Sequence, residues 1–165
     1  MKTLNQYIKE KLIINKDYSD GKMYHPKSFD ELRKIIEDRY DKLGAGTKQN
    51  PIDFNDIDVS NIDSFLNKRK VGIFERTKFE YIDISEWDVS EVTCMAYMFY
   101  GCYELKSVGN ISGWDVSNVT DMGFMFYCCS SFNQDISGFD ISNVKNISGM
   151  FNNCPIKKEY KPKFN

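Results

Sequence analysis

Residues 114–129 read Trp-Asp-Val-Ser-Asn-Val-Thr-Asp-Met-Gly-Phe-Met-Phe-Tyr-Cys-Cys, and this stretch decides the fold because copies of it recur along the chain. The segment Ile-Ser-Gly-Trp-Asp-Val-Ser begins at residue 111, and close variants of it begin at residues 84 and 136. These starts are 27 and 25 residues apart, and three other columns of residues keep the same offsets. The columns are Trp87, Trp114 and Phe139; Met98, Met125 and Met150; and Cys102, Cys129 and Cys154.

A fourth and degenerate copy begins at residue 57 with Ile-Asp-Val-Ser-Asn-Ile. In this copy Phe65 stands where the next copy has Met95, and the register is lost around the Lys-Arg-Lys run at 68–70. We expect this first copy to cap the stack of repeats.

Periods of this length are typical of solenoids, in which each unit buries its apolar side only against its neighbours. Residues 110–116 have the length and the residue types of a short strand that ends in a turn. Val119, Met122, Phe126 and Cys129 then recur at steps of three or four, which predicts a short helix with its inner face toward the core. The sequence therefore predicts an α/β solenoid in which each repeat is a strand, a turn and a short helix.

The N-terminal segment, residues 1–51, has helical character and ends in a linker. Thr3 and an apolar stripe that reaches Leu12 predict a first helix. Ser28 and Glu31 form a capping-box pair at the start of a second helix, which we expect to end at Gly44. We expect the two helices to cover one open end of the repeats at 52–154, with residues 155–165 forming a basic tail.

The pattern Trp-Asp-Val-Ser-Asn-Val-Thr-Asp-Met-x-x-Met-Phe-x-x-Cys at 114–129 resembles the BspA-like, Mycoplasma-lipoprotein-type leucine-rich repeat family. Residues 132–137, Phe-Asn-Gln-Asp-Ile-Ser, resemble that family's link between a helix and the next strand. The resemblance covers residues 52–154 and implies a leucine-rich-repeat-like arc with a parallel sheet and no catalytic residues. Many members are surface proteins that bind host proteins. We expect this chain to lack their export signal and lipobox, and it looks most similar to intracellular, phage-borne relatives with a helical N-terminal segment.

The charge of the chain argues against nucleic acid as a partner. The 165 residues carry a net charge of −2, and residues 81–154 hold nine acidic side chains against two basic ones, a local net charge of −7. A surface of this sign repels phosphate. Charged residues interrupt every apolar run near the N-terminus, so we expect neither a secretory signal nor a membrane span. The sequence thus predicts a cytoplasmic protein, located in the host cytoplasm if it is phage-encoded, with five reduced cysteines.

No residue pattern indicates an enzyme, a cofactor or a metal site. His25 is the only histidine, and one histidine before Pro26 forms no convincing triad with a cysteine or serine. The cysteines could be zinc ligands, but they recur along the stack rather than around one point, so we favour buried thiols. The repeated methionines could form a promiscuous binding box, but their spacing inside every repeat favours core columns. They are Met95, Met98, Met122, Met125 and Met150.

Asp88, Asp115 and Asp140 form a similar row of equivalent positions. A solenoid stacks such residues, so they could bind calcium or a basic partner. We favour the interpretation that they accept hydrogen bonds from backbone donors in the turn after each strand, together with Ser90, Ser117 and Ser142.

The candidate binding residues are aromatic side chains at positions that vary between copies. Tyr97 and Phe124 share a column with Gly149, and Tyr100 and Tyr127 share one with Asn152. Core positions would stay alike between copies, so this variation favours exposure, and neighbouring exposed aromatics are typical of binding hot spots. An equally weighted alternative is that these rings cover a neighbouring loop or the N-terminal helices.

These observations favour a non-enzymatic protein-protein interaction module, a phage-encoded binder or inhibitor of a host protein. Its partner would be a protein with a basic patch, and Glu86 and Glu91 would form the acidic rim of the binding surface. The alternative is a structural or assembly component of a virion or complex, and a hydrolase ranks third.

Overall fold

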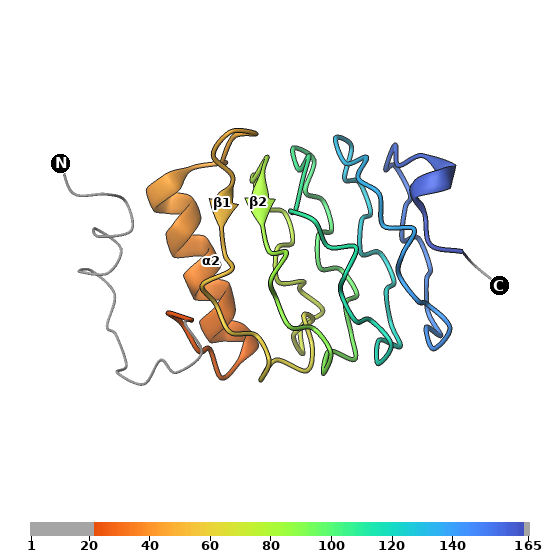
Figure 1. Ribbon diagram of the computed structural model, residues 1–165, viewed down its shortest axis with the longest axis horizontal. Coiled ribbons are helices and arrows are strands. Elements are labelled where there is room, and N and C mark those ends of the chain that lie inside the picture. The colour runs from red at the N-terminus through yellow and green to blue at the C-terminus, as the bar shows by residue number, and fades with distance from the viewer. Residues whose placement is uncertain (1–21, 164–165) are drawn as a thin grey trace.

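The computed structural model describes residues 22–163. Within this range the α-helix α2 (Phe29–Leu43) comes first, followed by the two-residue strands β1 (Ile52–Asp53) and β2 (Ile82–Asp83) and the 3-10 helix η1 (Lys158–Tyr160). From α2 at one end to η1 at the other, the chain makes successive passages that lie side by side (Figure 1). The first helix predicted at residues 3–12 lies outside the described residues.

Helix α2 forms where the capping signals predict a helix. Ser28 is its N-cap, and the Ser28 hydroxyl accepts a hydrogen bond of 3.3 Å from the Glu31 amide. Gly44 follows the helix with a φ of 75°, and its amide donates to the Tyr40 carbonyl. Leu32 and Ile36 are fully buried and join the core of the repeats, so α2 covers the N-terminal end of that core.

The predicted copies lie beside one another in parallel. Strands β1 and β2 pair in parallel, with Ile52 opposite Ile82, and a further parallel bridge joins Tyr81 to Ser107 on the same side of the molecule. On another side, parallel bridges run through one column of equivalent residues, which are Ser64, Cys94, Asp121 and Asn146. The backbone N–H groups of one copy donate to carbonyls of the next, as from Met95 to Asp121 at 2.8 Å. Hydrogen bonds between equivalent positions therefore hold the copies in register.

The short helix predicted in each repeat is wrong, because between Gly44 and Lys157 the structure contains turns and no helix. Along residues 95–102 the backbone N–H groups alternate in their partners. Met95, Tyr97, Phe99 and Gly101 donate to the next copy, whereas Met98, Tyr100 and Cys102 donate three residues back. Since an α-helix needs every N–H for its own i−4 carbonyl, this sharing excludes a helix. The three-to-four spacing in the sequence reflects consecutive turns.

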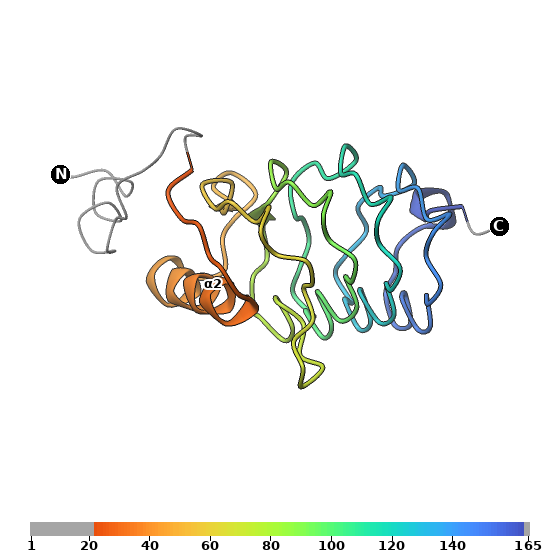
Figure 2. The same cartoon turned by 90° about the horizontal axis from the view of Figure 1, so that it is seen from below.

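A hairpin explains why the first copy loses register. Phe65 donates to the Cys94 carbonyl at 2.9 Å, so it occupies the column of Met95, as the sequence predicts. The chain then turns back on itself through an antiparallel bridge between Leu66 and Gly72, and the Ile73 amide returns to the Phe65 carbonyl. A Cβ atom at Gly72 would lie 1.9 Å from the Tyr97 carbonyl oxygen, so only glycine lets the hairpin close against the next copy. In Figure 2 this hairpin projects beyond the row of turns at the lower edge of the molecule.

The core consists of columns of equivalent side chains. All five methionines of the repeats are buried, which confirms their assignment to the core. The rings of Phe74, Phe99 and Phe126 stack at centroid distances of 5.4 and 5.2 Å. The Cys102 thiol donates to the Phe74 carbonyl at 2.9 Å, and the Cys129 thiol donates to the Phe99 carbonyl at 3.0 Å. Each large side chain buried in such a column stabilises the fold by about 1.5–3 kcal/mol.

The strand predicted at residues 110–116 is also wrong, because this stretch consists of turns and irregular backbone. The aspartates of the turn in each copy accept backbone hydrogen bonds, as predicted. Carboxylate oxygens of Asp88, Asp115 and Asp140 accept from the amides two residues later at 3.1, 3.0 and 3.0 Å. The donors are Ser90, Ser117 and Ser142. These hydrogen bonds close the turn that reverses the chain toward the next segment of each repeat.

Candidate binding surface

The surface of interest is the turn face, which we define as residues 94–101, 121–128 and 146–153. Two positions in each of these segments have left-handed backbone conformations. The first is Tyr97 at φ 60°, Phe124 at 58° and Gly149 at 63°. The second is Gly101, Cys128 and Asn153, at 69°, 58° and 56°. A bulky residue in this region costs about 1–2 kcal/mol relative to glycine, so the two aromatic residues occupy positions that backbone energetics would give to glycine.

Four half-buried aromatic residues gather on this face, and we call them the aromatic ladder: Tyr97, Tyr100, Phe124 and Tyr127. Tyr97 stacks on Phe124 with ring centroids 5.2 Å apart, and Tyr100 stacks on Tyr127 at 4.9 Å with ring planes only 6° apart. Within each copy the two rings also touch, at 5.3 Å in one copy and 5.7 Å in the next. The structure therefore brings together the four aromatic residues that the sequence singles out.

Two residues from the neighbouring copies pack against rings of the ladder. The Arg76 guanidinium lies over the Tyr100 ring, 5.8 Å from its centroid, on the side of the preceding copy. On the side of the last copy, a Cβ at Gly149 would lie 2.6 Å from Cε1 of Phe124, so the glycine lets its backbone pack against this ring. Neighbours thus cover the outer ring faces of Tyr100 and Phe124.

Tyr127 contributes a hydroxyl group to the ladder. The neighbouring Cys128 thiol, followed by the Tyr100 phenol, raises the pKa of Tyr127 above its ordinary value. The hydroxyl therefore remains a neutral donor and acceptor across the physiological pH range.

Glu86 and Glu91 are exposed, as predicted, but they contact none of the ladder residues. The Glu86 carboxylate lies 3.7 Å from the Lys22 ammonium, and its amide donates to the Asn55 side chain. Both contacts tie Glu86 to the N-terminal part of the described chain. These two acids can shape the field around the ladder but do not form part of it.

Sequence reasoning missed two neighbours of the ladder. Arg76 lies in the degenerate copy, whose register the sequence obscures. Tyr103 is 59% exposed, more than any ladder residue, because it follows the turn segment and leaves the repeat framework. Gly149 could have indicated the left-handed backbone of Tyr97 and Phe124, since a glycine in one copy of a repeated turn often marks such a position.

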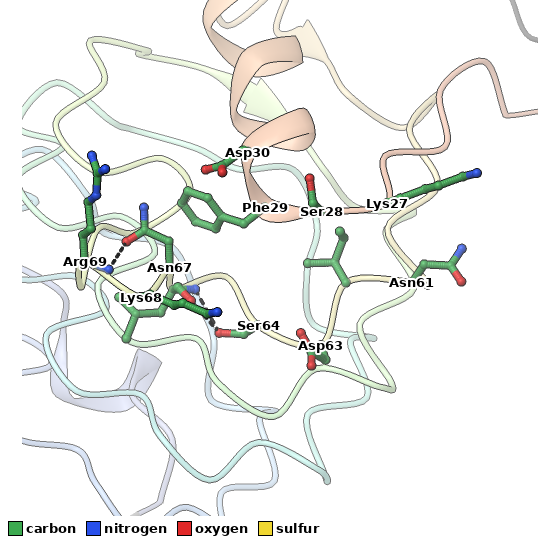
Figure 3. Close-up of a pocket in the computed structure, with 12 residues that line it drawn as sticks. Lys27, Ser28, Phe29, Asp30, Asn61, Asp63, Ser64, Asn67, Lys68 and Arg69 are labelled. Atoms are coloured by element: carbon green, nitrogen blue, oxygen red, sulfur yellow. Dashed lines mark hydrogen bonds between the residues drawn. The ribbon is translucent and has the colours of Figure 1, made fainter.

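A cavity of about 570 Å³ lies between the start of α2 and the hairpin of the first copy (Figure 3). Phe29, Ile62 and Leu66 supply its apolar lining. Lys27, Lys68 and Arg69 border it together with Asp30 and Asp63, so charges of both signs meet here. The Asn67 side chain, which accepts from the Arg69 amide at 2.9 Å, fixes the hairpin turn above the cavity.

The described residues hold no arrangement typical of nucleophilic or metal chemistry. His25 Nδ1 lies 3.0 Å from the Asp58 carboxylate. Although partial burial raises the pKa of Asp58, hydrogen bonds from Ser60 and His25 lower it to below its ordinary value. Burial raises the pKa of the Cys102 thiol to about 11, which is the opposite of what activates a nucleophile. No group of three or more metal-ligating side chains occurs between residues 22 and 163, and no helix in that range is long and apolar enough to cross a membrane.

The family comparison agrees with the motif at 114–129. A family described as "Mycoplasma protein of unknown function, DUF285" matches residues 69–161, which is more than half of the chain. The chain therefore belongs to the DUF285 family of Mycoplasma-type proteins. No curated protein and no solved structure matches it.

Proposed function

We propose that this member of the DUF285 family is a non-enzymatic protein-binding module that engages its partner through the aromatic ladder. One observation carries the proposal. Tyr97 and Phe124 adopt left-handed backbone conformations at a position where the next copy of the same turn has Gly149. Strained backbone that a fold could avoid tends to persist where function requires it.

Folding alone does not account for the choice of aromatic residues. The turn closes equally well in the third copy, where the Asn152 amide donates to the Gly149 carbonyl. In the two preceding copies the equivalent hydrogen bonds run from Tyr100 to Tyr97 and from Tyr127 to Phe124. A stacked aromatic pair gains about 0.5–1.5 kcal/mol beyond its buried area, which roughly balances the left-handed cost. With near-zero net benefit to stability, the benefit of the rings lies in what they present to a partner.

The ladder has the composition and rigidity of a binding hot spot. Tyrosine is among the residues enriched in hot spots, because it combines a large apolar surface with a polar tip and few rotatable bonds. Stacking between copies fixes the rings before binding, so little side-chain entropy is lost on association. We propose a protein partner, and no nucleic acid or membrane.

Charge around the ladder guides the orientation of the partner. Glu86 and Glu91 would face a basic patch of the partner and act on the rate of encounter, since rim charges mainly steer association. Arg76 would face an acidic or carbonyl group next to the position of Tyr100. We further propose that the partner is a host protein bound in the cytoplasm, in keeping with the resemblance to phage-borne relatives.

The fold that supports this surface is proposed to be a short leucine-rich-repeat-like solenoid. The parallel bridges between copies and the columns of buried methionine and phenylalanine support this assignment. The DUF285 match lies within the same repeats. In such a solenoid, each added copy extends the outer surface without changing the core.

The test uses full-length chain as bait in the native host, with mass spectrometry of what co-elutes. The co-eluting protein is then measured by surface plasmon resonance against a variant carrying Tyr97→Gly, Phe124→Gly and Tyr127→Ala. We expect this variant to fold and to lose binding, because each central aromatic anchor contributes about 2 kcal/mol or more. Neutralising Glu86 and Glu91 should instead slow association and weaken its salt dependence.

Tyr81→Ala is the matched control. Tyr81 is a half-buried tyrosine that lies under the Lys106 ammonium and belongs to the column of β1 and β2 rather than to the turn face. It should bind like the wild type. A folded ladder variant that binds at wild-type strength would move the site elsewhere, and concentration-dependent self-association without any heterologous partner would favour the structural role.

A further inference from the structure

We infer that the C-terminal edge of the turn face is a second binding site, which takes an extended, acceptor-rich segment of a partner protein as one further passage of the stack. This inference rests on the hydrogen bonding of the backbone and is independent of the aromatic ladder.

Four columns of N–H donors run through the turn face. Met95 and Met122 donate to the next copy at 2.8 and 2.9 Å, and Tyr97 and Phe124 do so at 3.0 and 2.9 Å. Phe99 and Phe126 form the third column, both at 3.0 Å, and Gly101 and Cys128 form the fourth, both at 2.8 Å. In every case the acceptor is a backbone carbonyl of the following copy.

The last copy continues the four columns, and three of its donors have no partner within the described chain. Ile147, Gly149 and Asn153 occupy three of the columns, and among the described residues none of their amides has a hydrogen-bond partner. Phe151 occupies the other column. Ile147 is also 40% exposed, whereas its counterparts Met95 and Met122 are fully buried. The edge therefore ends in a row of backbone donors with an exposed apolar side chain at one end.

The opposite end of the turn face is closed by a side chain. Arg33 of α2 donates to the carbonyls of Gly72, Ile73 and Glu75, at 3.2, 2.7 and 3.4 Å. In the interior copies, the carbonyls equivalent to Ile73 and Glu75 accept from the preceding copy instead. At the N-terminal end, the Arg33 guanidinium thus donates to carbonyls that in the interior copies accept from a preceding copy. At the C-terminal end, no described residue supplies carbonyls for the unpaired amides of the last copy.

The C-terminal segment closes only the other side of the last repeat. The Ile136 amide donates to the Tyr160 carbonyl at 3.0 Å, and the Lys157 amide donates to Asn133. These bonds lie on the strand side of the stack. Among the described residues, the C-terminal segment offers no acceptor to the backbone donors of Ile147, Gly149 and Asn153. Figure 1 shows η1 at the upper part of this end of the molecule.

The chemistry of the edge defines its occupant. Because Ile147, Gly149 and Asn153 offer only backbone donors, the occupant must supply carbonyl oxygens opposite them, as an extended backbone does. Lys161 lies over the Phe151 ring, 5.1 Å from the centroid. It also borders a hollow of about 580 Å³, where Lys158, Lys161 and Lys163 outnumber a single acidic residue, Glu159. These ammonium groups favour carboxylates in the occupant. A second copy of the chain fits poorly as the occupant, because the carbonyls at its N-terminal end already accept hydrogen bonds from its own Arg33.

The probe is a synthetic peptide of residues 119–130 with serine in place of Cys128 and Cys129, since this segment pairs with such an edge inside the fold. Full-length chain is titrated with it while amide hydrogen exchange is followed by NMR. In the free protein we expect the amides of Ile147, Gly149 and Asn153 to exchange much faster than those of Met122, Phe124 and Cys128. With the peptide bound, the three edge amides should become protected.

Two comparisons sharpen the test. Ile147→Pro removes one donor that makes no bond within the described chain, and it should weaken peptide binding several-fold, whereas Ile147→Val keeps the donor and should bind normally. A peptide extended by three C-terminal aspartates should bind more tightly at low salt than one extended by three lysines. Edge amides that stay unprotected at millimolar peptide would overturn the inference. So would protection that appears without peptide and grows with protein concentration, because a second copy would then be the occupant.

Discussion

Met125 and Tyr127 lie two residues apart in the same turn, yet they belong to opposite environments. Met125 is fully buried and shares its column with Met98 and Met150, so every copy has the same residue type there. Tyr127 faces outward in a column that changes from tyrosine to Asn152. The inner row is uniform because each side chain must fill the same space between neighbouring copies. The outer row is free to change, because core packing does not fix its composition.

The largest expected effect tests this contrast directly. Met125→Ala removes a side chain with buried counterparts on both sides, so we expect it to lower the free energy of unfolding by about 2–4 kcal/mol. Tyr127→Ala should cost far less, since the ring is half-exposed and loses mainly its stack on Tyr100. Guanidinium melts of both variants measure the difference. Equal losses would contradict the assignment of inner and outer rows.

The neighbouring cysteines extend the comparison to chemistry. Cys129 is buried and Cys128 is half-buried, and burial raises the pKa values of the Cys129 and Cys102 thiols. We expect iodoacetamide at pH 8 to modify Cys128 of the folded chain first, with Cys102 and Cys129 slower by about tenfold or more. Peptide mapping over time measures the order.

The unfolded chain is the control for this labelling experiment. All five cysteines are free, so protein purified without oxidant should take up five adducts in guanidinium. Three or fewer adducts would contradict the expectation of a reduced protein.

The repeat pattern was enough to predict the columns of the core, because burial between equivalent copies leaves a periodic trace in the sequence. Met95, Met122 and Phe65 fall where the pattern places them. The local conformation between these columns was not predictable in the same way. Steps of three or four residues arise from a helix and from consecutive turns alike, and only the sharing of N–H donors between copies distinguishes the two.

A third prediction concerns the left-handed backbone of the outer row. Glycine normally destabilises a chain relative to alanine, but Phe124 has a φ of 58°, which glycine adopts without strain. We therefore expect Phe124→Gly to be more stable than Phe124→Ala by about 1 kcal/mol. Val116, which is buried in the same repeat and does not have a positive φ, provides the control, because Val116→Gly should be less stable than Val116→Ala. Melts that rank both pairs in the same order would argue against strain at residue 124.

The candidate site was predictable only in part. Variation between copies identified the ladder residues, and the structure places all four in mutual contact. The same reasoning could not relate Glu86 and Glu91 to the ladder, because sequence offsets within a repeat do not say which side of the stack a residue faces. Arg76 was hidden by the hairpin that interrupts its copy.

The smallest expected effect concerns the outward aspartates at the turns. Hydrogen bonds from the Ser117 side chain and amide lower the pKa of Asp115, and those from Ser142 do the same for Asp140. A carboxyl whose pKa is lowered by folding stabilises the folded state above its unfolded pKa of about 3.9, and this contribution disappears as pH falls through the folded value.

The structure offers a natural neutral analogue, because Asn110 accepts the same kind of bond from the Ser112 amide at 3.2 Å. We therefore expect a double variant, Asp115→Asn and Asp140→Asn, to fold normally and to lose less stability than the wild type between pH 6 and pH 3. At pH 6 the two should have similar stability, because both side chains are fully exposed and the variant also removes the repulsion between adjacent copies. Urea melts across this pH range measure the slopes, and identical slopes would show that these turns are held by the backbone alone.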